Sequence, residues 1–131
     1  MNTKILMTVS AVLLAIMGIA LTFFPAELGA FFNISSTNST LFILQIGGAL
    51  YFAFAMLNWM AKGAIIGGIY NRPIAIGNFT HFTMVAIASV KYLFNQPLMP
   101  ISFWIFTVIY CILAISFAIT VFNHPAEKAA I

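Results

Sequence analysis

Charged side chains are what this sequence lacks most: five of its 131 residues are Lys or Arg and two are acidic, which is 5% of the chain. An ordinary soluble domain is about 25% charged. So few charges could not cover the surface of a soluble fold, which excludes a water-soluble monomer. Because 63% of the residues are hydrophobic, intrinsic disorder is excluded as well. Five scattered basic residues cannot form a basic patch, so we expect no nucleic-acid partner.

Cysteine and metal-ligating side chains are also rare. Cys111 is the single cysteine, so an internal disulfide cannot form. A tetrahedral zinc site needs about four N, S or O ligands, and the sequence offers one Cys, two His and two well-separated Glu. Paired carboxylates, a Ser-His-acid set and a Gly-rich phosphate loop are missing too. We therefore predict no metal site, no cofactor and no catalytic residue.

What the sequence does contain is long uncharged runs. The charged residues enclose runs of 22, 34, 18 and 35 residues, which begin after Lys4, Glu27, Arg72 and Lys91. A helix that crosses a bilayer needs about 20 mostly apolar residues. We therefore predict an all-α fold, an integral membrane four-helix bundle that forms one domain over residues 1–131. The predicted spans are 5–24, 41–61, 73–94 and 100–122.

Proline and capping residues mark the ends of these spans. Pro25 stops the first span, the Ser- and Thr-rich run 35–40 can cap the second, and Pro73 suits the first turn of the third. Residues 26–32 are expected to form a short turn of helix on the membrane surface. The segment 62–72 is too apolar for a free loop, so we expect it to dip into the headgroup region.

Two further predictions concern the first span and the topology. The first apolar run exceeds the core of about 7–15 residues of a signal peptide, so we expect it to be retained. With four spans, both chain ends and the second loop share one side of the membrane. That side holds four basic residues and the other side holds only Lys91, so the positive-inside rule places both termini in the cytoplasm. The four basic residues are Lys4, Lys62, Arg72 and Lys128.

Small residues recur at helical spacing in three of the spans. Helices in lipid associate by close packing of such residues, so we expect these stripes to face the bundle while Phe, Leu and Ile face lipid. The stripes are Ala11, Ala15 and Gly18; Gly48, Ala49 and Ala53; and Thr107, Cys111, Ala114 and Ala118.

Five polar side chains inside the spans are the candidates for a binding site, because polar groups in the bilayer core are costly unless they are paired or functional. Four of them fall in one layer of the cytoplasmic half by helical rise, together with the weaker candidates Ser10 and Ser116. The fifth, Gln45, lies near the outer end of its span, where its amide can instead hold neighbouring helices together. For His81 the structural alternative is an imidazole bonded to Tyr51 or to a backbone carbonyl. The predicted ligand-binding residues are His81, Asn78, Tyr51, Asn58 and Gln45.

Two stretches carry a resemblance to a known family. Residues 44–56 (LQIGGALYFAFAM) and 72–82 (RPIAIGNFTHF), together with the Pro25-x-x-Leu28 segment, resemble small four-span DoxX-like bacterial membrane proteins. The resemblance implies a compact four-helix bundle in the bacterial inner membrane. The wider group includes accessory subunits of quinone-linked oxidoreductases and a scaffold that gathers sterol-biosynthesis enzymes. Gln45 stands where many relatives have Arg, which argues against an anionic ligand there.

Four classes of function are compatible with this composition. The favoured hypothesis is a non-enzymatic membrane protein that binds a lipophilic molecule in the polar layer, or that acts as an accessory subunit. The alternative is a scaffold that assembles with itself or with membrane enzymes. A small multidrug transporter would need a carboxylate in the first span, and residues 5–24 contain none. A membrane enzyme would have to rely on His81 and Tyr51 for acid–base chemistry. Membrane lipid is the partner that every alternative shares.

Overall fold

The computed structural model describes residues 2–35, 37–64 and 69–122, and this part of the chain is helical, with no strand. Four helices are long and apolar enough to cross a membrane, which indicates a multi-pass membrane protein and confirms the predicted fold class. Their ends lie within three residues of the predicted ones. The elements are α1 (Thr3–Phe23), α2 (Pro25–Phe31), α3 (Asn38–Ala61), the 3-10 turn η1 (Ile69–Asn71), α4 (Arg72–Asn95) and α5 (Ile101–Phe122).

Side-chain caps explain where the first helices begin. The Asn2 side chain accepts a hydrogen bond from the backbone N–H of Lys4 at 3.1 Å, so α1 starts earlier than the apolar run alone predicts. Thr37 caps α3 in the same way through the N–H of Thr40, at 3.2 Å. As predicted, α1 ends just before Pro25, which opens the short helix α2, and Pro73 lies in the first turn of α4.

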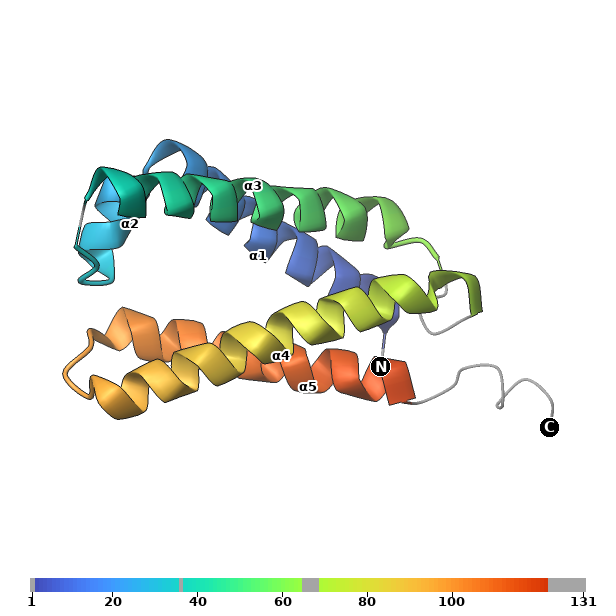
Figure 1. The fold of residues 1–131 in the computed structure, drawn as a ribbon. Helices are drawn as coiled ribbons and strands as arrows, with labels where there is room; N and C mark the ends of the chain where they lie inside the picture. The colour runs from blue at the N-terminus through green and yellow to red at the C-terminus, as the bar shows by residue number, and fades with distance from the viewer. Residues whose placement is uncertain (1, 36, 65–68, 123–131) are drawn as a thin grey trace.

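The helices are arranged as two pairs, α1 with α3 and α4 with α5 (Figure 1). The pairs approach each other at the end of the molecule where the N-terminus lies. They separate toward the other end, where α2 turns across from the α1–α3 pair toward α5. Contacts between the pairs are consequently much sparser than contacts within them.

Close backbone contact holds the α1–α3 pair together at two glycines. A Cβ atom placed on Gly18 would lie 2.7 Å from the backbone nitrogen of Phe52, and one on Gly48 would lie 2.8 Å from that of Thr22. Only glycine fits at such distances, so the predicted stripes are confirmed at both positions. The prediction is wrong for Ala49 and Ala53, which are exposed.

The error at these two alanines has a geometric cause. The buried face of α3 runs through Gly48, Ala55 and Asn58. Each residue turns the helix by about 100°, which rotates Ala49 and Ala53 away from that face. On α5 the prediction is confirmed for Thr107 and Ala114, which are buried, whereas Cys111 is only half-buried.

Aromatic rings fill the centre of the bundle between α4 and α5. The rings of Phe82 and Phe117 are stacked with centroids 5.4 Å apart, and Tyr110 lies against Phe82 at the same distance. All three side chains are fully buried. The outer surface is also apolar, with Ile, Phe and Leu side chains exposed along every long helix. Lipid is the solvent that suits such a surface.

The basic residues gather at one end of the molecule. Lys4 opens α1, Lys62 follows α3 and Arg72 opens α4, and these three helix ends meet near the N-terminus (Figure 1). Lys62 places its ammonium group 2.9 Å from the ring centroid of Trp59. Lys91 lies near the opposite end. Residues 65–68, the middle of the 62–72 segment predicted to dip into the headgroups, lie outside the described residues, as do the C-terminal residues that include Lys128.

Candidate functional site

The polar layer predicted in the spans centres on a pair of buried asparagines. Asn58 of α3 and Asn78 of α4 each donate a side-chain N–H to the carbonyl oxygen of the other, both at 2.7 Å. Asn58 also donates to the Ser10 hydroxyl of α1 at 3.0 Å. Asn78 also donates to the backbone carbonyl of Ile74 at 2.9 Å, and Ser10 donates to that of Met7 at 3.0 Å. One network therefore joins three helices across the boundary between the two pairs.

This amide layer (Ser10, Asn58 and Asn78) is closed by its own hydrogen bonds. All three side chains are 0% exposed, so no open space reaches them. Buried amides are costly when they lack partners, and here the partners are protein groups rather than a ligand. The amide layer therefore holds the two helix pairs together. Within the described part of the chain, no open space reaches the Asn58 and Asn78 side chains that were predicted to line a cavity.

His81 lies on the same face of α4, next to the amide layer, in an aromatic environment. Its ring stacks on Phe54 with centroids 5.1 Å apart and meets the ring of Tyr51 edge-on at 5.1 Å. Its Nε2 atom is buried and has no hydrogen-bond partner in the described part of the chain. The contact with Tyr51 is thus made between rings rather than through that nitrogen.

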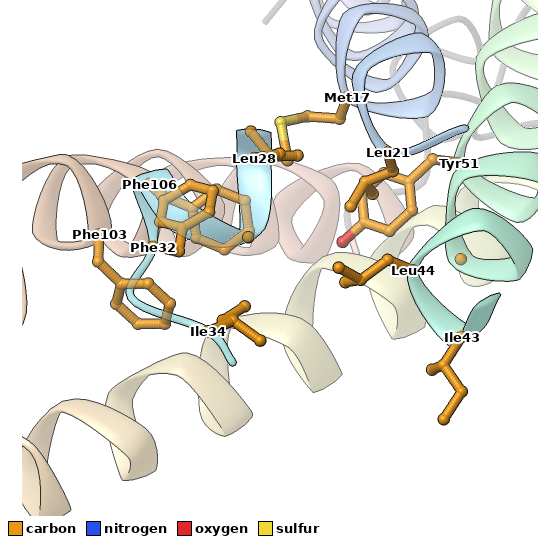
Figure 2. Close-up of a pocket in the computed structure, with 12 residues that line it drawn as sticks. Met17, Leu21, Leu28, Phe32, Ile34, Ile43, Leu44, Tyr51, Phe103 and Phe106 are labelled. Atoms are coloured by element: carbon orange, nitrogen blue, oxygen red, sulfur yellow. The ribbon is translucent and has the colours of Figure 1, made fainter. Parts of the chain in front are cut away.

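A cavity opens where the two helix pairs separate. Its volume is about 310 Å³, and its walls come from α1, α2, α3 and α5 (Figure 2). Ile43 stands at its rim and is 67% exposed, so the cavity reaches the lipid-facing surface. The lining residues are Met17, Leu21, Leu28, Gly29, Phe32, Ile34, Ile43, Leu44, Gly47, Tyr51, Phe103 and Phe106.

Tyr51 supplies the single polar side chain in this lining. Its hydroxyl points into the cavity, between Leu21 and Leu44 (Figure 2). The other lining side chains are hydrocarbon, glycine or thioether. The Tyr110 hydroxyl is buried and makes no hydrogen bond to the described residues. The cavity thus offers one hydrogen-bonding group in an otherwise apolar space.

The short helix α2 closes the cavity at the end of the bundle away from the N-terminus. Phe32, the residue that follows α2, packs edge-on against Phe103 and Phe106 of α5 at 5.6 and 5.8 Å. Leu28 and Gly29 of α2 face the same space. Sequence reasoning placed this helix on the membrane surface but did not assign it to a site. Gly29 of α2 is buried, which shows that this helix packs against other elements.

Of the five predicted site residues, the structure places only Tyr51 in this cavity. Asn58 and Asn78 pair with each other about 10 Å farther along the bundle axis. The His81 ring packs edge-on against the Tyr51 ring. Gln45 is exposed and donates to the backbone carbonyl of Thr22 at 3.3 Å, which ties α3 to α1. The alternative of a Gln45 amide that holds neighbouring helices is therefore confirmed.

The structure and the comparisons add two findings. Within residues 2–35, 37–64 and 69–122, no three His, Cys, Asp or Glu side chains lie close enough to hold a metal ion. Comparison with protein-family models, curated proteins and solved structures finds no significant match to this chain. What the protein does must therefore be inferred from its own geometry.

Proposed function

We propose that this protein binds a small lipophilic molecule in the cavity between its helix pairs. The observation that carries the proposal is the apolar space of about 310 Å³ with one hydroxyl directed into it. Ligand pockets typically measure about 300–1,000 Å³ and combine apolar walls with a few polar groups that fix orientation. The volume of the cavity lies at the lower end of that range, and its lining has the same mixture of apolar walls and a polar group.

The chemistry of the lining restricts the ligand class. Protein interiors pack to a density of about 0.74, so the cavity suits a single bicyclic ring system or a short branched chain. The Phe32, Phe103 and Phe106 rings favour a flat ring through edge and face contacts. Tyr51 can donate or accept one hydrogen bond. A ring with one hydroxyl or carbonyl group meets all of these conditions.

The amide layer supports this proposal from the other end of the bundle. Hydrogen bonds among Ser10, Asn58 and Asn78 hold the two helix pairs together near the N-terminus. The pairs stay apart at the α2 end, where the aromatic contacts of Phe32 bridge them. The cavity is consequently a feature of the helix packing.

The membrane placement proposed with this function is the bacterial inner membrane, with both termini in the cytoplasm. The three described basic residues at the N-terminal end, Lys4, Lys62 and Arg72, support that orientation through the positive-inside rule. The resemblance of residues 44–56 and 72–82 to DoxX-like proteins supports the bacterial assignment. An accessory role beside a membrane enzyme is compatible with this site, because a bound lipophile can be passed to a neighbour.

Binding of naphthalene to the purified protein in lipid nanodiscs tests the proposal. Leu44→Trp fills the cavity and should abolish the binding, because Leu44 lines it. The matched control is Ile105→Trp, at an exposed position of α5 outside the lining, which should bind like the parent. Equal binding by the two variants, or no saturable binding to the parent, would refute the proposed site.

A further inference from the structure

A second apolar depression lies on the outer face of the α4–α5 pair. It consists of two adjoining hollows of about 420 and 440 Å³, which share Val90, Phe94 and Cys111. None of their residues lines the cavity that contains Tyr51. Phe94, which lines both hollows, is 83% exposed. We call this continuous depression the α4–α5 groove.

The groove has the length of one lipid acyl chain. Along α5 it extends from Trp104 to Ile115, which are eleven residues apart. At the rise of an α-helix this is about 16 Å. Half of a hydrocarbon core about 30 Å thick is about 15 Å. The groove therefore runs from the outer end of the bundle to the middle of the membrane, the depth of one leaflet.

A single positive charge stands at the outer end of the groove. Lys91 lines it one turn before α4 ends, at the level where α5 begins with Trp104 nearby. No ion pair or hydrogen bond engages the Lys91 side chain within the described residues. Trp and Lys at such a position are typical of groups that meet lipid headgroups. An apolar groove of leaflet length thus ends at a cation that has no acidic partner among the described residues.

We propose that the α4–α5 groove is a binding site for an anionic phospholipid of the leaflet on the Lys91 side. One acyl chain lies in the groove beside Val90, Phe94 and Cys111, and the headgroup phosphate meets the Lys91 ammonium group. A second copy of the chain fits less well. A symmetric dimer on this face would bring the two Lys91 side chains together without an acidic partner.

Quenching of Trp104 fluorescence by brominated lipid tests the site directly. The protein has two tryptophans, so Trp59→Phe leaves Trp104 as the reporter in the groove. This variant is titrated in nanodiscs with phosphatidylglycerol or phosphatidylcholine that carries brominated acyl chains. We expect phosphatidylglycerol to quench at about fivefold lower mole fraction, the effect of one lysine near a lipid surface.

Two further variants, made in the Trp59→Phe background, separate the site from general charge attraction. Lys91→Ala should remove the preference for phosphatidylglycerol, whereas Lys4→Ala, at the opposite end of the molecule, should keep it. Equal quenching by the two lipids, or an unchanged preference in Lys91→Ala, overturns the proposal. Loss of quenching as the protein dimerises would assign the face to a second copy and would overturn it too. Neither result bears on naphthalene binding beside Tyr51.

Discussion

Asn58 and Asn78 exchange two hydrogen bonds of 2.7 Å across the boundary between the two helix pairs. This reciprocal arrangement satisfies each amide with the other, and Ser10 extends it to a third helix. Because direct contacts between the pairs are sparse elsewhere, the asparagine pair is the main polar connection between them. Its removal should affect the whole bundle rather than one helix.

Breaking the pair at one residue should therefore destabilise the fold. Asn78→Ala leaves the Asn58 amide buried without its partner, at an expected cost of about 1–3 kcal/mol. The double variant Asn58→Leu with Asn78→Leu should cost less than either single Leu variant, because no unpaired amide remains. Reversible unfolding in mixed micelles measures these values. Additive losses in this double-mutant cycle would contradict direct coupling.

The close approach of α1 and α3 predicts opposite behaviour for two adjacent glycines. Gly48→Ala places a Cβ 2.8 Å from the Thr22 nitrogen, so the helices must separate, at a cost of about 1–3 kcal/mol. Gly47→Ala meets nothing within 4 Å, and alanine favours the helix. Thermal unfolding should show a clear loss for the first variant and little change or a gain for the second. Equal effects would mean that the crossing is incorrectly placed.

The Tyr51 hydroxyl should strengthen the binding of 2-naphthol but not that of naphthalene, which lacks a hydroxyl group. Tyr51→Phe should weaken 2-naphthol binding about three- to tenfold, as expected for one hydrogen bond of about 1 kcal/mol. Binding of naphthalene should not change, since the ring of the side chain is retained. Affinities of both ligands for both proteins can be compared by competition in nanodiscs. A similar loss for naphthalene would show that the substitution disturbs the cavity wall instead.

Phe32 should control how well α2 closes the cavity. Phe32→Ala removes the two edge-on contacts with Phe103 and Phe106, so α2 should detach more readily from α5. Hydrogen exchange of the α2 amides should then accelerate, and naphthalene should dissociate faster. Phe42→Ala is the matched control, because Phe42 is 63% exposed and lies outside the lining. Equal exchange rates in the two variants would argue against a closing role.

Topology can be tested with single cysteines in a Cys111→Ala background. Ala26→Cys at the α2 end should react with an impermeant maleimide added outside intact cells. Gly63→Cys at the opposite end should react only after the cells are opened. Both positions are exposed in the structure. The reverse labelling pattern would invert the proposed orientation while leaving the fold unchanged.

Much of the architecture follows from the sequence because it rests on local signals. Charge-free runs fix the spans, Pro25 fixes the end of α1, and helical rise places Ser10, Asn58 and Asn78 at one depth. The cavity cannot be predicted from the sequence, because it depends on which helices pair and on the angle between the pairs. Those are set by the contact of Gly18 and Gly48 and by aromatic packing, which involve residues distant in the sequence.

The polar residues of the spans divide between a closed hydrogen-bond network and the cavity. Polar residues were expected to face an opening, but Asn58 and Asn78 are complementary to each other and close on themselves. Tyr51, another residue of that set, lies outside this network and directs its hydroxyl into the cavity (Figure 2). Sequence spacing alone does not reveal which polar groups pair and which stay open.

Because the helix pairs are joined at one end and not at the other, the molecule presents a different surface to each leaflet of a bilayer. On the Lys4 side, lipid meets a bundle that is sealed by the amide layer. On the Glu27 side, it meets the rim at Ile43 and the space behind it. The proposed ligand, dissolved in that leaflet, would therefore enter sideways from the hydrocarbon, without crossing the midplane or passing through water.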